Sequence, residues 1–205
     1  PVRLRRSIGY VLQEGGLFPH RTIADNIATV PRLEGATKQA SRERALELLT
    51  LVGLDREMAD RYPAQLSGGQ RQRVGVARAL ANRADILLMD EPFGALDPIV
   101  RAELQRELKE IQRALGTTIL FVTHDVDEAF TLGDQVAVLS TGGHIEQVGT
   151  PTELLSSPAS PFVAEFVGAS RAARPVHLEG SDGLIVDEAG TPVGTLASDE
   201  AGERP

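Results

Sequence analysis

The sequence predicts an α/β fold with a mostly parallel sheet, because short apolar runs alternate with segments of helical periodicity along the chain. The apolar runs at residues 8–12, 86–89 and 118–122 have the length of buried strands. The segment between the first two runs is mainly helical in pattern. We therefore predict an inserted helical subdomain over about residues 20–82.

The helices are predicted from apolar spacing and from stop signals. One stripe has the spacing i, i+3, i+4 and i+7 before Gly53, and consists of Ala45, Leu48, Leu49 and Val52. A helix over about residues 68–81 leads into the second strand, and another follows Pro98 and ends at Gly116. A β-hairpin is expected around Gly142-Gly143.

The composition is that of a globular chain. Of the 205 residues, 41% are apolar and 24% are charged, which suits one domain of ordinary size. The apolar runs fall far short of the ~20 residues that a membrane-spanning helix needs, and no signal-peptide pattern is visible. The absence of cysteine excludes disulfides and thiolate metal sites and is typical of a reducing compartment. These features favour the cytoplasm.

The negative charge is concentrated at the C-terminal end. The net charge is −8, and the residues from Pro175 onward hold seven acidic side chains and one basic side chain. The body of the chain is therefore close to neutral and lacks the basic patch of a nucleic-acid binder. We predict no nucleic-acid partner and treat residues 169–205 as a separate acidic tail.

The segment Leu66–Gln70 combines a helix cap with a pair of glycines. Ser67 can cap the following helix, and Gln70, three residues later, completes a capping box. Gly68 and Gly69 would let a phosphate approach bare backbone N–H groups at the positive end of the helix dipole. The pattern indicates a phosphate site, although these residues could simply begin a helix.

Two adjacent carboxylates follow the second strand. An apolar strand that ends in Asp90 and Glu91 places both at the sheet edge where ligands of open α/β folds gather. Asp90 suits Mg²⁺, which prefers hard oxygen ligands, and Glu91 could orient or deprotonate an attacking water. A strand followed by a polar turn is the plain alternative.

Asp97 and His124 complete the polar set. Asp97 lies seven residues after Asp90, and His124 lies two residues after the third strand. A lone histidine near a strand end is more often a surface or core residue. At the end of a strand next to Asp90 and Glu91, however, His124 could bond a γ-phosphate oxygen.

Together these residues resemble the ATPase subunit of an ABC transporter. Five motifs of that family occur in the family's order over most of residues 1–168. They are the Q-loop glutamine, the signature, the Walker B aspartate with its catalytic glutamate, the D-loop and the switch histidine, matched by Gln13, residues 66–70, Asp90 with Glu91, residues 95–97 and His124. Agreement of five ordered motifs by chance is negligible.

The resemblance implies a P-loop NTPase (RecA-like) core with ATP and Mg²⁺ as cofactors. It implies catalytic roles for Glu91 and His124, and Asp90 and Gln13 as Mg²⁺ ligands. It assigns ATP binding to Gln13, Ser67, Gly68, Gly69, Gln70 and Asp97. It also implies a head-to-tail dimer in which each ATP lies between the Walker A loop of one subunit and the Ser-Gly-Gly of the other.

A phosphate-binding loop with Gly-Lys-Ser/Thr is not found in the sequence. The only lysines are Lys38 and Lys109, and neither has that context. In the family the loop precedes the Q-loop by several dozen residues, whereas twelve residues precede Gln13 here. We therefore expect an N-terminally truncated ATPase domain over residues 1–168; a chain that naturally lacks the loop is the alternative.

Finer similarity points to one group of importers. Residues 13–20, 121–130 and 160–168 are similar to the ATPases of glycine betaine, choline and carnitine importers. Importers of polyamines, sulfate or sugars are the alternative. The family implies permease subunits as partners, a substrate-binding protein acting indirectly, and a place at the cytoplasmic face of the membrane.

An apolar tripeptide beside the Q-loop is a candidate docking site for the permease. Leu17, Phe18 and Pro19 would receive a helix of the membrane subunit if exposed, because apolar anchors serve interfaces well. If buried, they would instead fill the joint between subdomains.

Two other interpretations exist for the whole chain. Non-transport ABC proteins that act on ribosomes or in DNA repair carry two ATPase units or a long coiled coil, and this sequence predicts neither. A degenerate, non-catalytic subunit is disfavoured by Glu91 and His124. In the tail, residues 183–196 have a strand-turn-strand pattern similar to a fragment of a CBS regulatory module, with an acidic disordered tail as the alternative.

Overall fold

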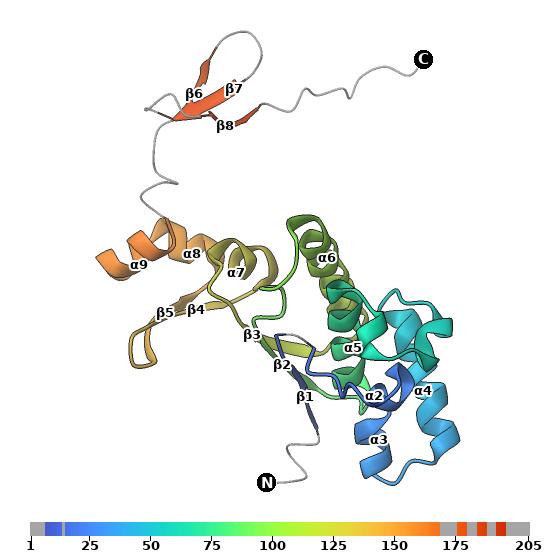
Figure 1. Ribbon diagram of the computed structural model, residues 1–205. Helices are drawn as coiled ribbons and strands as arrows, with labels where there is room; N and C mark the ends of the chain where they lie inside the picture. Colours follow the sequence, from blue (N-terminus) through green and yellow to red (C-terminus); the bar gives the residue numbers. More distant parts are fainter. Residues whose placement is uncertain (1–6, 14, 169–175, 180–183, 188–191, 196–205) are drawn as a thin grey trace, which may run out of the picture. The chain divides into compact units, whose positions relative to one another are not determined.

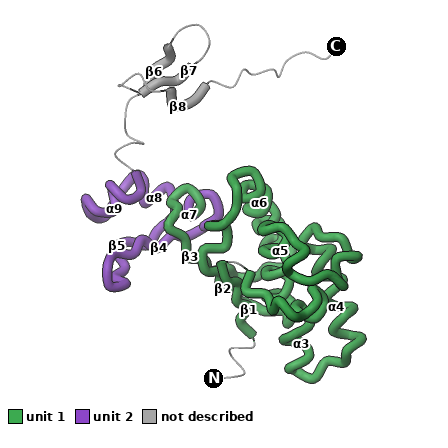
Figure 2. Tube along the Cα trace, in the orientation of Figure 1, with its two compact units in different colours: residues 1–128 green, residues 129–205 purple. Residues whose placement is uncertain are grey.

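The computed structural model describes residues 7–13, 15–168, 176–179, 184–187 and 192–195 (Figure 1). The chain divides into two compact units, residues 1–128 and 129–205 (Figure 2). Among the helices in the described ranges, none has both the length and the apolar character to cross a membrane.

The first unit contains a three-stranded parallel sheet. Its strands are β1 (Ile8–Val11), β2 (Ile86–Asp90) and β3 (Thr118–Val122), in the order β1-β2-β3. Because the strands are parallel, their carboxyl ends meet at one edge of the sheet, where polar side chains can converge. The predicted parallel sheet is confirmed.

The two faces of this sheet differ in exposure. Val11, Leu87 and Met89 are at most 2% exposed, and α5 packs beside β1. The opposite face presents Leu120 and Val122, each 62% exposed. The expectation of fully buried strands is therefore correct for one face only, because the described helices cover a single side of these strands.

The inserted helical segment between β1 and β2 is present as predicted. It consists of α2 (Ile23–Ile27), α3 (Thr29–Leu33), α4 (Lys38–Leu51), the 3₁₀ turns η1 (Arg56–Asp60) and η2 (Pro63–Gln65), and α5 (Gly68–Leu80). These helices lie together beside the sheet in Figure 1. The apolar stripe of α4 is buried, and Gly53 follows it with a positive φ of 67°. Helix α4 contacts α2 and α5, and since the stripe residues are buried, the periodicity identified the buried face of the helix correctly.

Helix α6 (Pro98–Leu115) connects β2 to β3. Gly116 ends it in the left-handed conformation, as the sequence predicts, and Asp97, which was expected only as an ATP-binding residue, also caps its start. On α5, Arg73 Nη1 lies 2.6 Å from Glu107 Oε2 on α6, and the Arg73 side chain is only 13% exposed. This partly buried ion pair ties α5 to α6.

The second unit begins at Ala129, inside α7 (Val126–Leu132), so this helix crosses the boundary between units. It contains the predicted hairpin as β4 (Val136–Ser140) and β5 (His144–Gly149), then α8 (Pro151–Ser156) and α9 (Pro161–Phe166). At the start of α8, hydrogen bonds from the Thr150 backbone N–H and hydroxyl lower the pKa of Glu153. The charged carboxylate therefore completes a capping box.

Three antiparallel strands occupy the described parts of the tail. They are β6 (Val176–Glu179), β7 (Leu184–Asp187) and β8 (Pro192–Thr195), in the order β6-β7-β8. Strands β7 and β8 correspond to the strand-turn-strand pattern seen in the sequence, while β6 was not predicted. Whether this sheet is a fragment of a regulatory module stays an expectation.

Candidate active site

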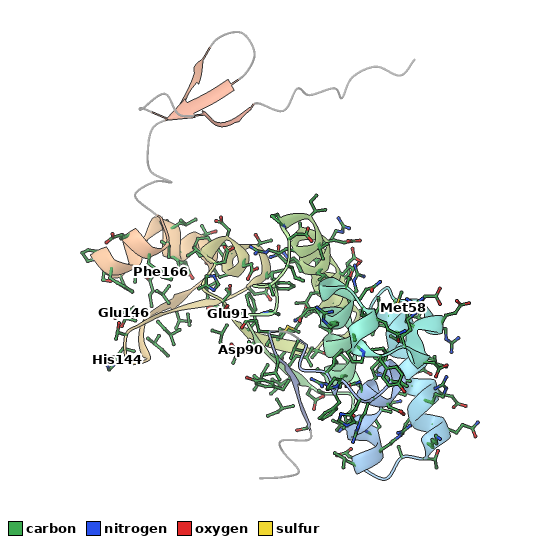
Figure 3. All side chains as sticks on the ribbon, viewed as in Figure 1. Met58, Asp90, Glu91, His144, Glu146 and Phe166 are labelled. Carbon is green, nitrogen blue, oxygen red and sulfur yellow. The ribbon has the colours of Figure 1, made fainter. Side chains whose placement is uncertain are left out.

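Glu91, directly after β2, has an unusual backbone conformation. Its φ is 42°, in the left-handed region that residues other than glycine rarely adopt. Its N–H donates to the Val122 carbonyl at 3.0 Å, and its carbonyl accepts from the Gly94 N–H at 3.2 Å. Figure 3 shows Asp90 and Glu91 at this end of β2. A strained residue held from two sides is a feature of functional sites.

The side chains of Glu91 and His124 meet at the sheet edge. Glu91 Oε1 lies 3.1 Å from His124 Nδ1, and the two side chains are 31% and 76% exposed. The third group is the amide of Gln13. A β-carbon built on Gly94 would lie 3.3 Å from both Gln13 Nε2 and Glu91 Oε2, so both side chains lie close to Gly94. The structure therefore brings together Gln13, Glu91 and His124, which follow β1, β2 and β3 respectively.

Asp90 is exposed at the end of β2, beside this group. Within the described ranges, no set of three or more histidine, aspartate or glutamate side chains is arranged to hold a metal ion. A carboxylate such as Asp90 can still hold Mg²⁺, which keeps several waters and commonly takes one or two protein carboxylates plus phosphate oxygens. The exposed Asp90 fits that limited role.

The residues on both sides of His124 are anchored by Glu128, which is 5% exposed. The Thr123 hydroxyl donates to Glu128 Oε2 at 2.7 Å, and the Asp125 N–H donates to Thr123 Oγ1 at 3.0 Å. Gln105 of α6 donates to the other oxygen, Glu128 Oε1, at 3.2 Å. The backbone that carries His124 is thus fixed although the imidazole itself is exposed.

Arg101 of α6 connects this anchor to the segment before Asp97. Its Nη1 lies 3.3 Å from Asp125 Oδ2, and its Nη2 donates to the Leu96 carbonyl at 3.4 Å. The sequence alone predicts no role for Arg101, Asp125 or Glu128. The sequence feature that could have indicated a role for Arg101 is its position one helical turn after Asp97. A small open pocket is lined by Glu91, Gly94, Arg101, Thr123, His124, Asp125 and Glu128.

Ser67 begins α5 with the capping box that the sequence predicts. The Gln70 N–H donates to Ser67 Oγ at 3.2 Å, and the Ser67 N–H donates to Gln70 Oε1 at 3.0 Å. Neither residue lines the pocket beside Glu91 and His124. The described residues therefore form two separate groups of predicted site residues, one at the sheet edge and one at the start of α5.

The two glycines after Ser67 have different surroundings. A β-carbon on Gly69 would lie 2.8 Å from Val100 Cγ1 on α6, so close packing of the two helices requires glycine there. A β-carbon on Gly68 would have ordinary contacts only. Apart from the neighbouring residues and the nearby helix backbone, its nearest atom would be Leu96 Cδ2 at 3.8 Å. Packing explains Gly69 but leaves Gly68 without a structural reason.

Asp97 serves as the N-cap of α6. Its Oδ1 accepts from the Ile99 N–H at 3.2 Å and from the Val100 N–H at 3.1 Å. Since Val100 also packs on Gly69, the starts of α5 and α6 lie side by side. Asp97 is therefore next to the Ser67 group rather than in direct contact with Glu91.

The candidate docking residues lie on a loop organised by Asn26. Phe18 is 39% exposed, Pro19 is exposed and Leu17 is half-buried. The fully buried Asn26 accepts from the Phe18 N–H at 2.7 Å and donates to the Phe18 carbonyl at 3.1 Å. The Arg21 guanidinium stacks over the Phe18 ring at 4.8 Å from its centroid. The loop thus presents Phe18 from a rigid base.

The comparison with known proteins decides the family. The family model described as ABC transporter matches residues 2–94. Over 171 residues the chain is 57% identical to the glycine betaine/carnitine/choline transport ATP-binding protein of Bacillus subtilis, which covers 83% of this chain and 45% of that protein. The chain belongs to the ABC transporter ATPase family.

Two other similar proteins support this assignment. The chain is 52% identical over 169 residues to the glycine betaine uptake system ATP-binding protein of Escherichia coli, covering 82% of this chain and 54% of that one. It is also 52% identical over 186 residues to the sulfate/thiosulfate import ATP-binding protein of Brucella melitensis, with coverages of 89% and 51%. The chain thus spans about half the length of the curated relatives it matches.

A solved structure confirms the fold. A dimeric ATP-binding cassette in a post-hydrolysis state, bound to ADP and Pi, is 35% identical and superimposes with a TM-score of 0.63. The match covers 73% of this chain and 65% of that chain. The core is therefore that of a P-loop NTPase, as the motifs of this ATPase family predict.

Proposed function

We propose that this chain belongs to the ATP-hydrolysing subunit of an importer, in which Glu91 and His124 are the catalytic residues; by itself, without a phosphate-binding loop, this sequence should not turn over ATP. The observation that carries the proposal is the 3.1 Å pair of Glu91 and His124 at the carboxyl edge of the sheet, with Glu91 held at a φ of 42°. Perturbed backbone geometry and converging acid and base groups at this edge are characteristic of catalytic sites in α/β folds.

Each residue at the edge has a chemical role in this proposal. Glu91, partly shielded, accepts a proton from the attacking water or fixes its orientation. His124, which is 76% exposed on an anchored backbone, donates a hydrogen bond to the terminal phosphate. Asp90 and Gln13 would hold Mg²⁺, which neutralises phosphate charge when bound. Lys38 and Lys109, in α4 and α6, are outside this group.

The start of α5 would bind the nucleotide of a second subunit. Ser67, Gly68, Gly69 and Gln70 lie outside the pocket of Glu91 and His124, and Gly68 leaves backbone N–H groups open at the positive end of a 13-residue helix. Asp97, beside Ser67, would face the same nucleotide. This arrangement suits a head-to-tail dimer, and the similar solved structure is described as dimeric.

A direct test of the proposal is ATP turnover by the assembled ATPase. Phosphate release should require Mg²⁺ and should stop when the ion is removed by a chelator, then return on adding Mg²⁺ back. Turnover that persists in the chelator, or a subunit that releases no phosphate with its partners present, would refute the proposed activity.

For the substrate we propose quaternary amines such as glycine betaine, choline or carnitine. The support is that relatives named for these substrates reach 57% identity, although a sulfate/thiosulfate relative reaches 52%. The ATPase residues described above contact nucleotide rather than cargo, so the decisive test is uptake by the whole transporter. Labelled glycine betaine should accumulate in an ATP-dependent way and labelled sulfate should not.

The contrast between Gly68 and Gly69 gives a paired prediction. Gly68→Ala should leave the melting temperature nearly unchanged but lower ATP turnover, because the added methyl stands where the phosphate would approach the helix start. Gly69→Ala should instead destabilise the fold by about 1–3 kcal/mol, since its methyl meets Val100 at 2.8 Å. Thermal melts and phosphate release on both variants distinguish them; equal effects on stability would contradict the assignment.

We further propose that Leu17, Phe18 and Pro19 dock a helix of the membrane permease. Phe18→Asp should reduce transport and permease-stimulated ATP turnover by about tenfold or more, because truncating a hot-spot residue at the centre of an interface costs about 2 kcal/mol or more. Since Phe18 is 39% exposed, the isolated subunit should keep its melting temperature. An exposed apolar residue away from this loop, Leu33 at 68%, provides the control variant Leu33→Asp. A subunit that unfolds on Phe18→Asp would show that Phe18 fills a joint instead.

A further inference from the structure

The turn after Gln13 lies directly against α5. Gly15 has a φ of 74°, and a β-carbon on it would lie 2.8 Å from the Arg71 carbonyl oxygen of α5. A β-carbon on Gly75 would lie 3.0 Å from the Cα of Gly15. Two backbones are therefore in contact at a place where neither residue can carry a side chain.

Arg78, one turn further along α5, fastens this contact. Its Nη1 donates to the Gly16 carbonyl at 2.7 Å and its Nη2 donates to the Gly15 carbonyl at 2.9 Å. Burial lowers the pKa of Arg78, so the side chain has given up part of its hydration to make these bonds. A guanidinium fork that bonds two successive carbonyls fixes both position and orientation of the turn.

The other end of the same loop is held independently. The Asn26 amide bonds the N–H and the carbonyl of Phe18, as described above, and it also donates to the carbonyls of Arg21 and Thr22 at 3.1 and 2.9 Å. The segment from Gly15 to Phe18 is thus held at one end by Arg78 of α5 and at the other end by Asn26 of α2. Arg78 is the attachment nearer to Gln13.

We infer that Arg78 is a positioning residue that joins the Gln13 loop to the helix that begins at Ser67. The inference rests on the proposed function, because it makes Gln13, the Phe18 docking surface and the Ser67 helix start parts of one connected body. A displacement of the docked loop is then transmitted through the Arg78 fork to α5, and through α5 to the nucleotide of the opposing subunit. The fork couples the membrane partner to both nucleotide sites.

The test replaces the fork in the ATPase subunit assembled with its permease. Arg78→Met keeps a long side chain but removes both hydrogen-bond donors. Arg78→Lys keeps a positively charged donor but not the planar guanidinium that bonds two carbonyls. Arg106→Met, on the exposed side of α6, is the control. In Arg78→Met, permease-stimulated kcat should fall about tenfold or more with KM for ATP nearly unchanged, because misplacing a catalytic group by about 1 Å can reduce the rate a hundredfold. Arg78→Lys should recover part of the loss, and Arg106→Met should match wild type.

Hydrogen exchange supplies a readout that does not depend on catalysis. The Gly15 N–H bonds the Leu12 carbonyl, and this amide should exchange about tenfold faster in Arg78→Met once a charged hydrogen bond is lost. The Phe18 N–H bonds Asn26, which the variant leaves in place, so the Phe18 amide is the internal reference. Wild-type exchange at the Gly15 amide, or normal kcat per folded subunit despite a lower melting temperature, would overturn the inference. Absence of ATP turnover in the wild-type assembly would refute the proposed function instead, and the exchange result would still decide the role of Arg78.

Discussion

Glu91→Gln should reduce ATP turnover by about 10²–10⁴-fold, the range that a general base contributes. Glutamine keeps the size of the side chain and can still bond His124 across the 3.1 Å contact, but it cannot take a proton from water. The fold should be unaffected, because the Glu91 backbone is held by Val122 and Gly94 rather than by its carboxylate. Phosphate release under saturating Mg-ATP measures the effect.

The same variant should accumulate in an ATP-bound dimer, because binding survives while turnover stops. Size-exclusion chromatography with ATP would show the dimer, and addition of ADP alone would not. Glu146→Gln, on the exposed face of β5 (Figure 3), is the matched control and should behave as wild type. Near-normal turnover in Glu91→Gln would remove Glu91 from the proposed role.

The features that depend on local pattern were predictable from the sequence. The strand that leads into Asp90 and Glu91, the cap at Ser67, and the stops at Gly53 and Gly116 are all set by residues within one or two helical turns. Parallel pairing of β1, β2 and β3 then places the residues after each strand at one edge without further information. The convergence of Gln13, Glu91 and His124 follows from topology.

The features that the sequence did not reveal depend on contacts between distant residues. Arg78 meets Gly16 and Gly15 across 62 and 63 positions, and Arg101 meets Asp125 across 24. The different surroundings of Gly68 and Gly69 arise from the approach of α6, which no spacing within the signature encodes. The exposed face of the sheet was missed for a related reason, since an apolar run does not say which of its faces a helix will cover.

A mixed dimer of Ser67→Arg and Glu91→Gln subunits should retain one working site. In a head-to-tail dimer the Glu91 of each chain shares a nucleotide with the Ser67 of the other. The arginine and the glutamine then fall in the same composite site and leave the second site with neither lesion. Differently tagged subunits, purified through both tags, would give this heterodimer, and about half of the wild-type phosphate release is expected.

The reversed arrangement provides the control for this experiment. A Ser67→Arg, Glu91→Gln double variant paired with wild type places one lesion in each composite site, so its turnover should fall to the level of the Glu91→Gln dimer. If Ser67 served the nucleotide of its own chain, the two heterodimers would exchange these results. The expected difference between the two heterodimers rests on the separation of the two groups in the structure. Ser67 caps α5 beside Leu96 and Val100, whereas no residue of α5 lines the pocket of Glu91 and His124. An arginine at the open start of α5 would project toward the opposing subunit and exclude its phosphate, without touching the Glu91 of its own chain.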